Sequence, residues 1–318
     1  IGGGASLEYK NSIPLPKIIP GIDTNNLLKN TNIKESNQYV QTTIGKAYNL
    51  TDKWSASVAL RGVYGKSTLK ASTTTKNWAL FPVLGPLLGN LSNKNATIDS
   101  ERTAFGIGGQ FGLTYAPNDK LNIGFRYDTP IKLDFKTKAT INDKTKIFPN
   151  KPSVSESLLG MYPVYKDGLK TRRDLPGLMA LGASYKVTDK WTTFVGGNYY
   201  FNEAATMDRV EGMNVDYHNG WEVSAGSEYW LNNKYAWLVG INYADTGAPT
   251  SSYSSTEYAI NSTMVGTGLK IKQNDTTEWT IAYNHYFYDT TSGVNSSGQS
   301  IRYSKEISSV GVNFVKRF

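Results

Sequence analysis

Apolar and polar residues alternate along most of this chain with a period of two. In "FGIGGQFGLTY" (105–115), the odd positions are mostly large and apolar, whereas the even positions are small or polar. The same division recurs in "LNIGFRY" (121–127) and in "WEVSAGSEYWL" (221–231). This alternation is typical of β-strands with one apolar face, and no long segment has the period of a helix. The glycines of "GIGG" (106–109) lie within such a strand, where they thin the inner wall or ease its curvature.

The pattern predicts twelve strands, at about 1–10, 37–50, 54–71, 99–116, 121–138, 173–187, 191–206, 218–232, 235–246, 257–272, 277–290 and 300–318. Short polar turns at 51–53, 117–120, 188–190, 232–234 and 274–276 alternate with longer loops, notably at 11–36, 72–98 and 139–172. Short turns at one end and long loops at the other are typical of an up-and-down barrel in an outer membrane. Lipid offers no partner to an open sheet edge, so we expect closure.

We therefore predict a single all-β domain over residues 1–318, a transmembrane antiparallel up-and-down β-barrel with about twelve strands visible. The loops at about 11–36, 72–98 and 139–172 are expected to be extracellular. The sequence "TDKW" occurs twice, at 51–54 and 188–191, and Trp237 and Trp279 follow two other short turns. Tryptophan is favoured at a membrane interface, so these four residues should form a periplasmic belt at one height.

Composition agrees with a membrane barrel and excludes several other classes. Hydrophobic residues make up 39% of the 318 residues and the mean hydropathy is −0.41. No apolar run reaches the length of about 18 residues that a transmembrane helix needs. There is no cysteine and there are only two histidines, so we expect no disulfide, metal or cofactor. The net charge of +8 comes from scattered lysines, which argues against a nucleic acid partner.

No enzyme motif is present: the chain lacks a Walker loop, GxSxG and HExxH. A lipid-modifying enzyme on a barrel would need a serine or histidine nucleophile system. Two histidines that lie far apart in the sequence, His218 and His285, do not provide one, so we expect no enzymatic activity.

Two long loops are unusually apolar. "WALFPVLGPLLGNL" (78–91) is too short to span a bilayer, and the loop at 139–172 adds further apolar residues. One hairpin separates the two loops, so they can lie side by side. They form either an inward-folded cap or an external groove that captures a hydrophobic solute. The candidate capture residues are Trp78, Leu80, Phe81, Val83, Leu84, Leu87, Leu88, Phe148, Leu158, Leu159 and Met161.

Charged residues also fall on the polar, inward parity of several strands. They either line a polar lumen without further role or guide an anionic ligand along it. Arg126 and Asp128 in "FRYD" lie on the same face two residues apart, and this is the favoured element. Arg61 is a further candidate; the other inward charges are Lys186, Glu222, Glu228 and Lys270.

The last strand, "VGVNFVKRF", ends in Phe318 and resembles the assembly signal of bacterial outer-membrane barrels. It predicts the barrel assembly machinery as a partner, together with outer-membrane lipid and lipopolysaccharide. The chain opens directly on a strand-like segment, with no signal peptide in the given sequence, so we expect either a mature chain or one whose start is missing.

Several segments resemble the FadL family of outer-membrane long-chain fatty acid and hydrocarbon transporters (OMPP1/FadL/TodX type). These segments are "GGGASLEY", "IGKAYNLTDKWSASVALRGVYGKSTLKA", "YDTPIKLDF" and "LPGLMALGASYKVTDKWTTFVGGNYYF". The resemblance implies a fourteen-stranded barrel with an N-terminal hatch, a shallow site between the apolar loops, a deeper site inside and sideways release at a kinked strand. The given sequence departs from this pattern in lacking the hatch, with its Asn-Pro-Ala motif, and about two strands, so we expect that an N-terminal portion is missing from it. The family's carboxylate-binding positions fall near Lys70 and His218, and its kink falls at "NSIPLP" (11–16).

The expected function is facilitated uptake of long-chain fatty acids or similar hydrophobic molecules across a bacterial outer membrane. Capture takes place at the apolar loops and release is lateral, into the membrane. A general porin or a surface-binding, adhesin-like barrel is the alternative.

Overall fold

The computed structural model describes residues 2–10, 26–83, 85–142, 150, 152–160, 162–206, 216–253, 258–294 and 300–317. The segment "NSIPLP" (11–16) lies outside the described residues. One large antiparallel sheet dominates, with sequential strands as neighbours in the order β1-β2-β3-β4-β5-β8-β9-β10-β11-β12-β13-β16. The sheet has fourteen strands within the described ranges. The twelve strands on this path match the predicted ones in number and order. Their bounds are Gly2–Lys10, Leu28–Asn49, Trp54–Thr75, Asn95–Asn118, Leu121–Asp128, Leu178–Lys186, Trp191–Tyr200, Gly220–Trp230, Tyr235–Asp245, Ser262–Asn274, Thr277–Tyr288 and Glu306–Lys316.

Further short strands and helical turns lie in the long connections, at the long-loop end of the sheet. β6 (Asp134–Ile141) pairs with β4 and with β7 (Lys170–Arg172), and β14 (Thr291–Val294) pairs with β15 (Ser300–Tyr303) in a separate hairpin. The helical turns are η2 (Trp78–Leu80), α1 (Gly85–Leu88), η3 (Gly89–Leu91), α2 (Val154–Gly160), η4 (Pro163–Tyr165), η5 (Asn202–Ala204) and η6 (Thr250–Ser252). None of the helices in the described part of the chain is long and apolar enough to cross a membrane.

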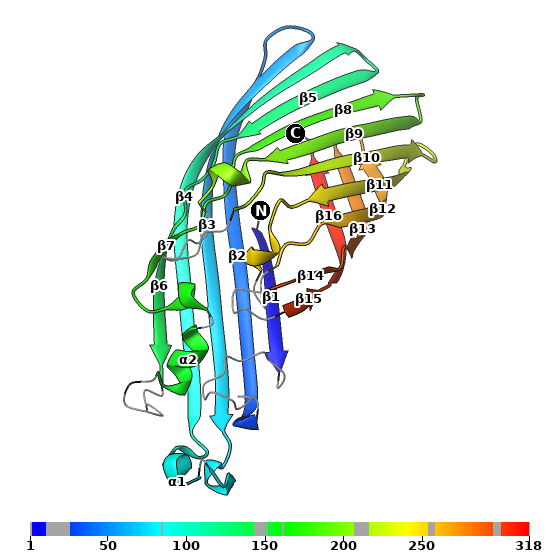
Figure 1. Ribbon diagram of the computed structural model, residues 1–318. Helices are drawn as coiled ribbons and strands as arrows, with labels where there is room; N and C mark the ends of the chain where they lie inside the picture. Colours follow the sequence, from blue (N-terminus) through cyan, green and yellow to red (C-terminus); the bar gives the residue numbers. More distant parts are fainter. Residues whose placement is uncertain are drawn as a thin grey trace.

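The sheet curves strongly, but it is open (Figure 1). Within the described ranges β1 and β16 are edge strands with no pairing between them, so the expected closure of the twelve strands is not observed. β1, β2, β3, β4 and β6 extend beyond β5 and the strands from β8 to β13 at the long-loop end (Figure 1). They project as an arm, with α2 beside it and α1 at its tip.

Three predicted boundaries are corrected by the structure. β2 begins at Leu28, so the loop predicted at 11–36 ends earlier, because the buried side chains of Leu28 and Ile33 continue the strand pattern. The loop predicted at 139–172 contains α2, η4 and β7. The strand predicted at 300–318 is two strands, β15 and β16, interrupted at 304–305.

The strand predicted at 121–138 is also interrupted. β5 pairs with residues 110–118 of β4 and β6 pairs with residues 98–103, while residues 129–133 leave the ladder and turn inward. Ile131 is fully buried and forms an isolated bridge with Leu175. The inward segment lies directly on Gly106 and Gly108: a Cβ atom at either position would come within 2.6 Å of the Ile131 side chain. These two glycines therefore thin the wall, as predicted, and admit this segment.

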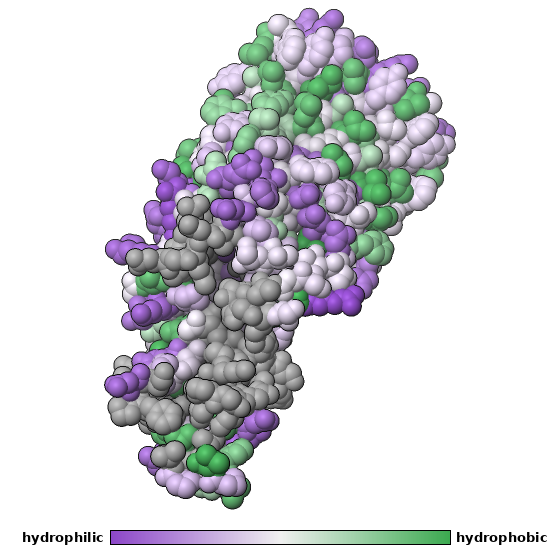
Figure 2. Space-filling model, in the orientation of Figure 1, coloured by the Kyte–Doolittle hydropathy of each residue, from purple (hydrophilic) through white to green (hydrophobic). Residues whose placement is uncertain are grey.

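The outward face of the sheet is apolar, and the four tryptophans lie on it. Trp54, Trp191, Trp237 and Trp279 are 38%, 40%, 52% and 38% exposed. Trp54 and Trp191 are the first residues of their strands after a short turn, and Trp237 and Trp279 are the third residues of theirs. In Figure 2, hydrophobic side chains gather on the upper part of the molecule, where Figure 1 shows the short-turn ends of the strands. Alternation along each strand places the opposite parity on the inner face.

The short turns share one local cause. The first polar side chain of each turn accepts hydrogen bonds from backbone N–H groups two or three residues later. The Thr51 hydroxyl accepts from the N–H groups of Lys53 and Trp54, and the Asn232 amide oxygen accepts from those of Lys234 and Tyr235. The "TDKW" sequence is thus a self-capped turn that delivers a tryptophan to the start of the next strand.

Candidate functional site

Both apolar loops contribute side chains to one buried cluster. Trp78, Leu88 and Leu91 of the β3–β4 connection share one buried cluster with Val154, Leu159, Tyr162 and Tyr165 of the β6–β7 connection. The cluster rests on the inner face of the projecting arm, against residues such as Ile33 and Leu69. The connections therefore form a compact apolar head on the arm rather than two free loops.

Trp78 anchors this head. Its side chain is 1% exposed, and its indole N–H donates a hydrogen bond of 2.9 Å to the Leu27 carbonyl oxygen. Its backbone N–H donates to the Ser92 hydroxyl at 2.7 Å. These contacts place Trp78 in the interior of the head, where it holds the two ends of its loop together.

Buried polar contacts fix the second loop. The Tyr165 hydroxyl donates to the Glu35 carboxylate at 2.7 Å. The Arg102 guanidinium lies 4.9 Å from the Phe135 ring centre and 5.4 Å from that of Tyr165, and it donates to the Thr171 hydroxyl. A cation between two aromatic faces is stabilised by their quadrupoles, so this core locks η4 onto β4 and β6.

The candidate capture residues divide between interior and surface. Leu88 and Leu159 are buried with Trp78, and Phe81 is half-buried against the same cluster. Leu80 and Val83 are each 78% exposed and form an apolar tip. Leu84, Phe148 and Met161 lie outside the described residues, as do the side chains of Leu87 in α1 and Leu158 in α2.

Lys70 lies on the other side of the arm. Leu69 and Ala71 point into the apolar head, and alternation along β3 turns Lys70 to the opposite face. There its ammonium group is 3.3 Å from the Asp99 carboxylate, and both side chains are more than 60% exposed. The structure therefore does not bring Lys70 to the capture residues.

Arg61 and Arg126 meet on the inner wall. The Asp128 carboxylate, whose side chain is 6% exposed, lies 3.3 Å from the Arg61 guanidinium and 3.4 Å from that of Arg126. Arg61 also donates to the Gln41 amide oxygen at 2.9 Å. Two guanidinium groups share one carboxylate, so the group carries a net charge of +1.

A pocket of about 290 Å³ adjoins Arg126, and it is lined further by Asn198, Glu222, Ser224 and Asn242. The Tyr200 hydroxyl donates to the Glu222 carboxylate at 2.8 Å. Among the other inward charges, Lys270 pairs with Glu228, and Lys186 pairs with Asp189 at a short turn. The inner wall is thus polar and largely self-paired: the net charge of +1 on Arg61, Arg126 and Asp128 is balanced by the Glu222 carboxylate in the adjoining pocket.

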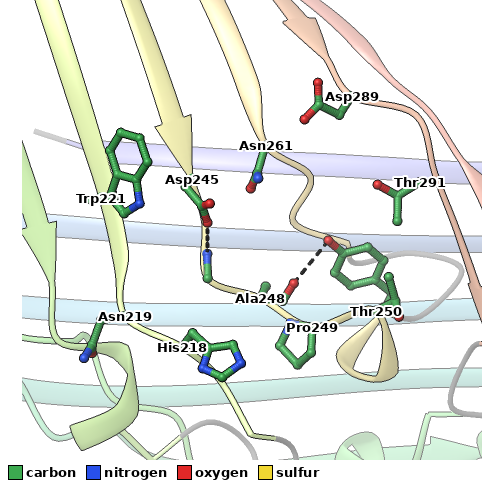
Figure 3. Close-up of a pocket in the computed structure, with 12 residues that line it drawn as sticks. His218, Asn219, Trp221, Asp245, Ala248, Pro249, Thr250, Asn261, Asp289 and Thr291 are labelled. Atoms are coloured by element: carbon green, nitrogen blue, oxygen red, sulfur yellow. Dashed lines mark hydrogen bonds between the residues drawn. The ribbon is translucent and has the colours of Figure 1, made fainter.

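His218 lies elsewhere, at the long-loop mouth of the sheet. It lines a hollow of about 410 Å³ together with Trp221, Asp245, Asn261 and Asp289 (Figure 3). The Asp245 carboxylate accepts a hydrogen bond from the Gly247 N–H at 2.9 Å. Two carboxylates, Asp245 and Asp289, and no lysine or arginine line this hollow, so it suits a ligand that donates hydrogen bonds better than it suits a carboxylate.

A tyrosine cluster borders this hollow. Tyr253 and Tyr303 are buried and stack edge to face at 5.1 Å, with Tyr258 beside them. The Lys305 ammonium lies 4.4 Å from the Tyr288 ring centre, and burial lowers the pKa of this lysine. The contacts tie the β14–β15 hairpin to the mouth of the sheet. No group of three or more histidines, aspartates and glutamates within the described residues could hold a metal ion.

No curated protein sequence matches the chain at a significant level. Solved structures that share its fold include a Pseudomonas aeruginosa FadL homologue, which is 15% identical with a TM-score of 0.58; the match covers 90% of this chain and 67% of that one. The P. putida toluene transporter TodX is 15% identical with a TM-score of 0.60, over 100% of this chain and 77% of that one. The Ralstonia pickettii toluene transporter TbuX is 16% identical with a TM-score of 0.55, over 90% of this chain and 69% of that one. The model of the family described as "Outer membrane protein transport protein (OMPP1/FadL/TodX)" matches residues 23–314. The chain therefore belongs to the OMPP1/FadL/TodX family of outer membrane transport proteins.

Proposed function

We propose that this chain takes up long-chain fatty acids or similarly hydrophobic small molecules by facilitated diffusion, and that the apolar head captures them. The observation that carries this proposal is the exposed apolar tip, where Leu80 and Val83 stand on a packed apolar cluster. Exposed apolar patches on folded proteins commonly mark binding sites. A solute that lands on this tip lies next to Phe81, at the edge of the cluster.

The guanidinium groups of Arg61 and Arg126 on the inner wall favour an amphiphile that carries a carboxylate. Arg61 and Arg126 have a net charge of +1 after pairing with Asp128, and Arg126 is half exposed beside the 290 Å³ pocket. An arginine fork binds a carboxylate in two parallel hydrogen bonds. We therefore assign the deeper site of the proposed route to Arg61 and Arg126 in preference to Lys70 and His218. The toluene transporters among the structural neighbours make a neutral aromatic solute the alternative cargo.

Release is proposed to be lateral, into the membrane. Between the ladders with β5 and β6, residues 104–108 of β4 have no strand partner on that side within the described ranges. The inward segment at 129–133 fills the space behind them. Phe105 and Ile107 point outward here and are 63% and 58% exposed. A shift of this segment would open the wall next to lipid.

The test is uptake of labelled oleate by cells that lack other fatty acid transporters and express this chain. Deletion of the whole loop is unsuitable, because it would also remove the Trp78 anchor. The double variant Leu80→Ser/Val83→Ser removes the apolar tip only, and we expect uptake to fall about tenfold, as for loss of about 1.4 kcal/mol of capture. Lys166→Ser, an exposed position in the neighbouring loop, is the matched control.

Unchanged oleate uptake in the double variant would remove the tip from the mechanism. A large, steady single-channel current that oleate does not affect would favour the general porin instead. Binding to surfaces without uptake would favour an adhesin-like barrel.

A further inference from the structure

Two opposite charges lie in one row of the inner wall without pairing with each other. The row runs across four neighbouring strands at one height, through Arg126 of β5, Ala180 of β8, Asn198 of β9 and Glu222 of β10. The Arg126 side chain is 47% exposed, and its ion pair is with Asp128. Within the described residues no ion pair joins it to Glu222. The positive and the negative end of the row are therefore both open to a ligand.

The space between these two charges belongs to the pocket of about 290 Å³, which both residues line. Three strand spacings separate their Cα atoms, or about 14 Å. Ala180, between them, contributes only a methyl group. The two long side chains thus face a space that a small polar group can fill.

Glu222 can accept a further hydrogen bond. Its Oε1 atom accepts from the Tyr200 hydroxyl at 2.8 Å. Its Oε2 atom accepts from the amide groups of Asn198 at 3.3 Å and of Asn242 at 3.5 Å. The last two bonds are long and therefore weak. A carboxylate has about four acceptor positions, so these donors do not saturate it.

Beside this row, on the side of the short turns, the inner wall is bare. Gly124, Gly182 and Gly196 lie opposite one another in the ladders of β5, β8 and β9. A Cβ atom at Gly124 would meet nothing within 4 Å, and at the other two glycines the nearest described atoms belong to adjacent strands. Phe194, which is 41% exposed, follows two residues before Gly196 on the same face. These three glycines form a floor on which an apolar chain can lie.

We propose that this pocket selects hydrophobic molecules whose head group is neutral and both donates and accepts a hydrogen bond, such as a long-chain alcohol or an undissociated fatty acid. The inference rests on the proposed function in one respect, since it takes the pocket to be on the transport route. The head-group O–H donates to the Glu222 carboxylate, and the hydroxyl or carbonyl oxygen accepts from the Arg126 guanidinium. The apolar chain lies over the glycine floor towards Phe194.

The charges of the pocket disfavour other head groups. An ionised carboxylate has only acceptors, so it can bind Arg126 but is repelled by Glu222. An ether or an ester leaves Glu222 without a donor. A hydrocarbon displaces water from both charges and replaces none of its hydrogen bonds, which costs free energy. A fatty acid therefore fits this pocket best in its undissociated form.

The test measures occupancy of the pocket directly. The chain has no cysteine, so Ser224→Cys, in the lining of the pocket, supplies a single thiol. Its rate of reaction with a water-soluble thiosulfonate is measured on the full chain in lipid nanodiscs, with 1-octanol, its methyl ether or octanoate at neutral pH. We expect octanol to slow the reaction at about one tenth of the concentration that the other two require. Ser309→Cys, an inward position of β16, is the matched control and should not be protected.

Replacement of Glu222 should reverse the preference. Glu222→Gln keeps an acceptor but removes the negative charge, so octanoate should protect at about tenfold lower concentration and octanol should require about threefold more. Each ligand is compared with itself between variants, so its partitioning into the membrane cancels. Glu203→Gln removes the same charge at an exposed position outside the pocket and should change neither value. Ala180→Leu fills the space between the charges and should abolish protection by octanol.

Equal protection by octanol and its ether, or an unchanged order in Glu222→Gln, would refute selection by Glu222. Protection by none of the three would show that the pocket is not a ligand site. Gel mobility before and after heating verifies that each variant is folded. The uptake assay separates these outcomes from failure of the proposed function. A preference for octanol without oleate uptake would retain this site and remove the transport role, whereas oleate uptake with equal protection by octanol and its ether would do the reverse.

Discussion

Arg61 of β3 and Asp128 of β5 face each other across β4 on the inner wall, with the Arg61 Nη1 atom 3.3 Å from the Asp128 Oδ2 atom. Their side chains are only 11% and 6% exposed. The contact joins two strands that are not neighbours, so it depends on the registers of both ladders of β4. Because Asp128 neutralises one of the two arginines, the contact also sets the positive charge that remains to attract the carboxylate of a ligand.

Replacement of Asp128 should therefore affect both stability and transport. Asp128→Ala leaves two guanidinium groups without their shared carboxylate, and we expect a loss of about 2–4 kcal/mol in the free energy of unfolding. Urea unfolding in lipid vesicles measures this. Arg126→Ala, at a side chain that is 47% exposed, is the comparison and should cost about 1 kcal/mol or less. Equal costs for the two variants would show that Asp128 is not the centre of the group.

The inward segment predicts an unusual sensitivity at two glycines. A side chain at Gly108 would come within 2.6 Å of Ile131 and 3.0 Å of the Thr129 hydroxyl, so Gly108→Ala must displace the segment. We expect a cost of about 1–3 kcal/mol, as for overpacking of a core. Gly124→Ala, on β5, meets nothing within 4 Å and should be close to neutral. Thermal unfolding of both variants in the same detergent measures the two changes in stability. If Gly108→Ala were as stable as the unsubstituted chain, the close packing of Ile131 on Gly108 would be contradicted.

Period two was sufficient to predict the strands, the short turns and the inward position of Arg61, Arg126 and Asp128. It could not predict the break at 129–133, because "TPIKL" continues the alternation while the ladder ends. Parity also places His285 outward. Its side-chain partners Glu306 and Ser308 are more than 20 residues away, and only the register of β13 and β16 joins them. The alternation of apolar and polar residues therefore could not predict contacts that depend on the register between strands.

The apolar loops show a second limit. The single hairpin between them predicted that they can lie side by side, and both contribute to one buried cluster. Hydrophobicity alone did not separate the buried anchor residues from the exposed ones. Trp78 and Leu88 are each 1% exposed, whereas Leu80 is 78% exposed, although all three belong to one apolar run. The difference arises from the 3-10 turn of η2 and the Ser92 hydroxyl that bonds its start.

This division of roles gives a prediction for the head. Trp78→Ala should destabilise the packing of the two loops by about 3–5 kcal/mol, since it empties a buried site and removes the bond to Leu27. Leu80→Ala should leave that packing intact. Hydrogen exchange of the backbone amides at 85–98 measures the difference, with amides of β10 as the internal reference. Similar exchange in both variants would mean that Trp78 is not the anchor.

The tryptophan belt can be tested by measuring how deep each tryptophan lies in the membrane. In the ladder, Tyr229 lies opposite both Trp191 and Trp237, and Trp279 lies opposite Phe314, so aromatic side chains line the short-turn rim. Variants that retain a single tryptophan, at 54, 191, 237 or 279, should show the same depth of quenching by spin-labelled lipids, to within about one strand spacing of 5 Å. Trp221, on the outward face at the other end of β10, is the control and should be quenched at the opposite interface. If the four belt positions differed from one another as much as they differ from Trp221, the short-turn rim would not lie at a single membrane interface.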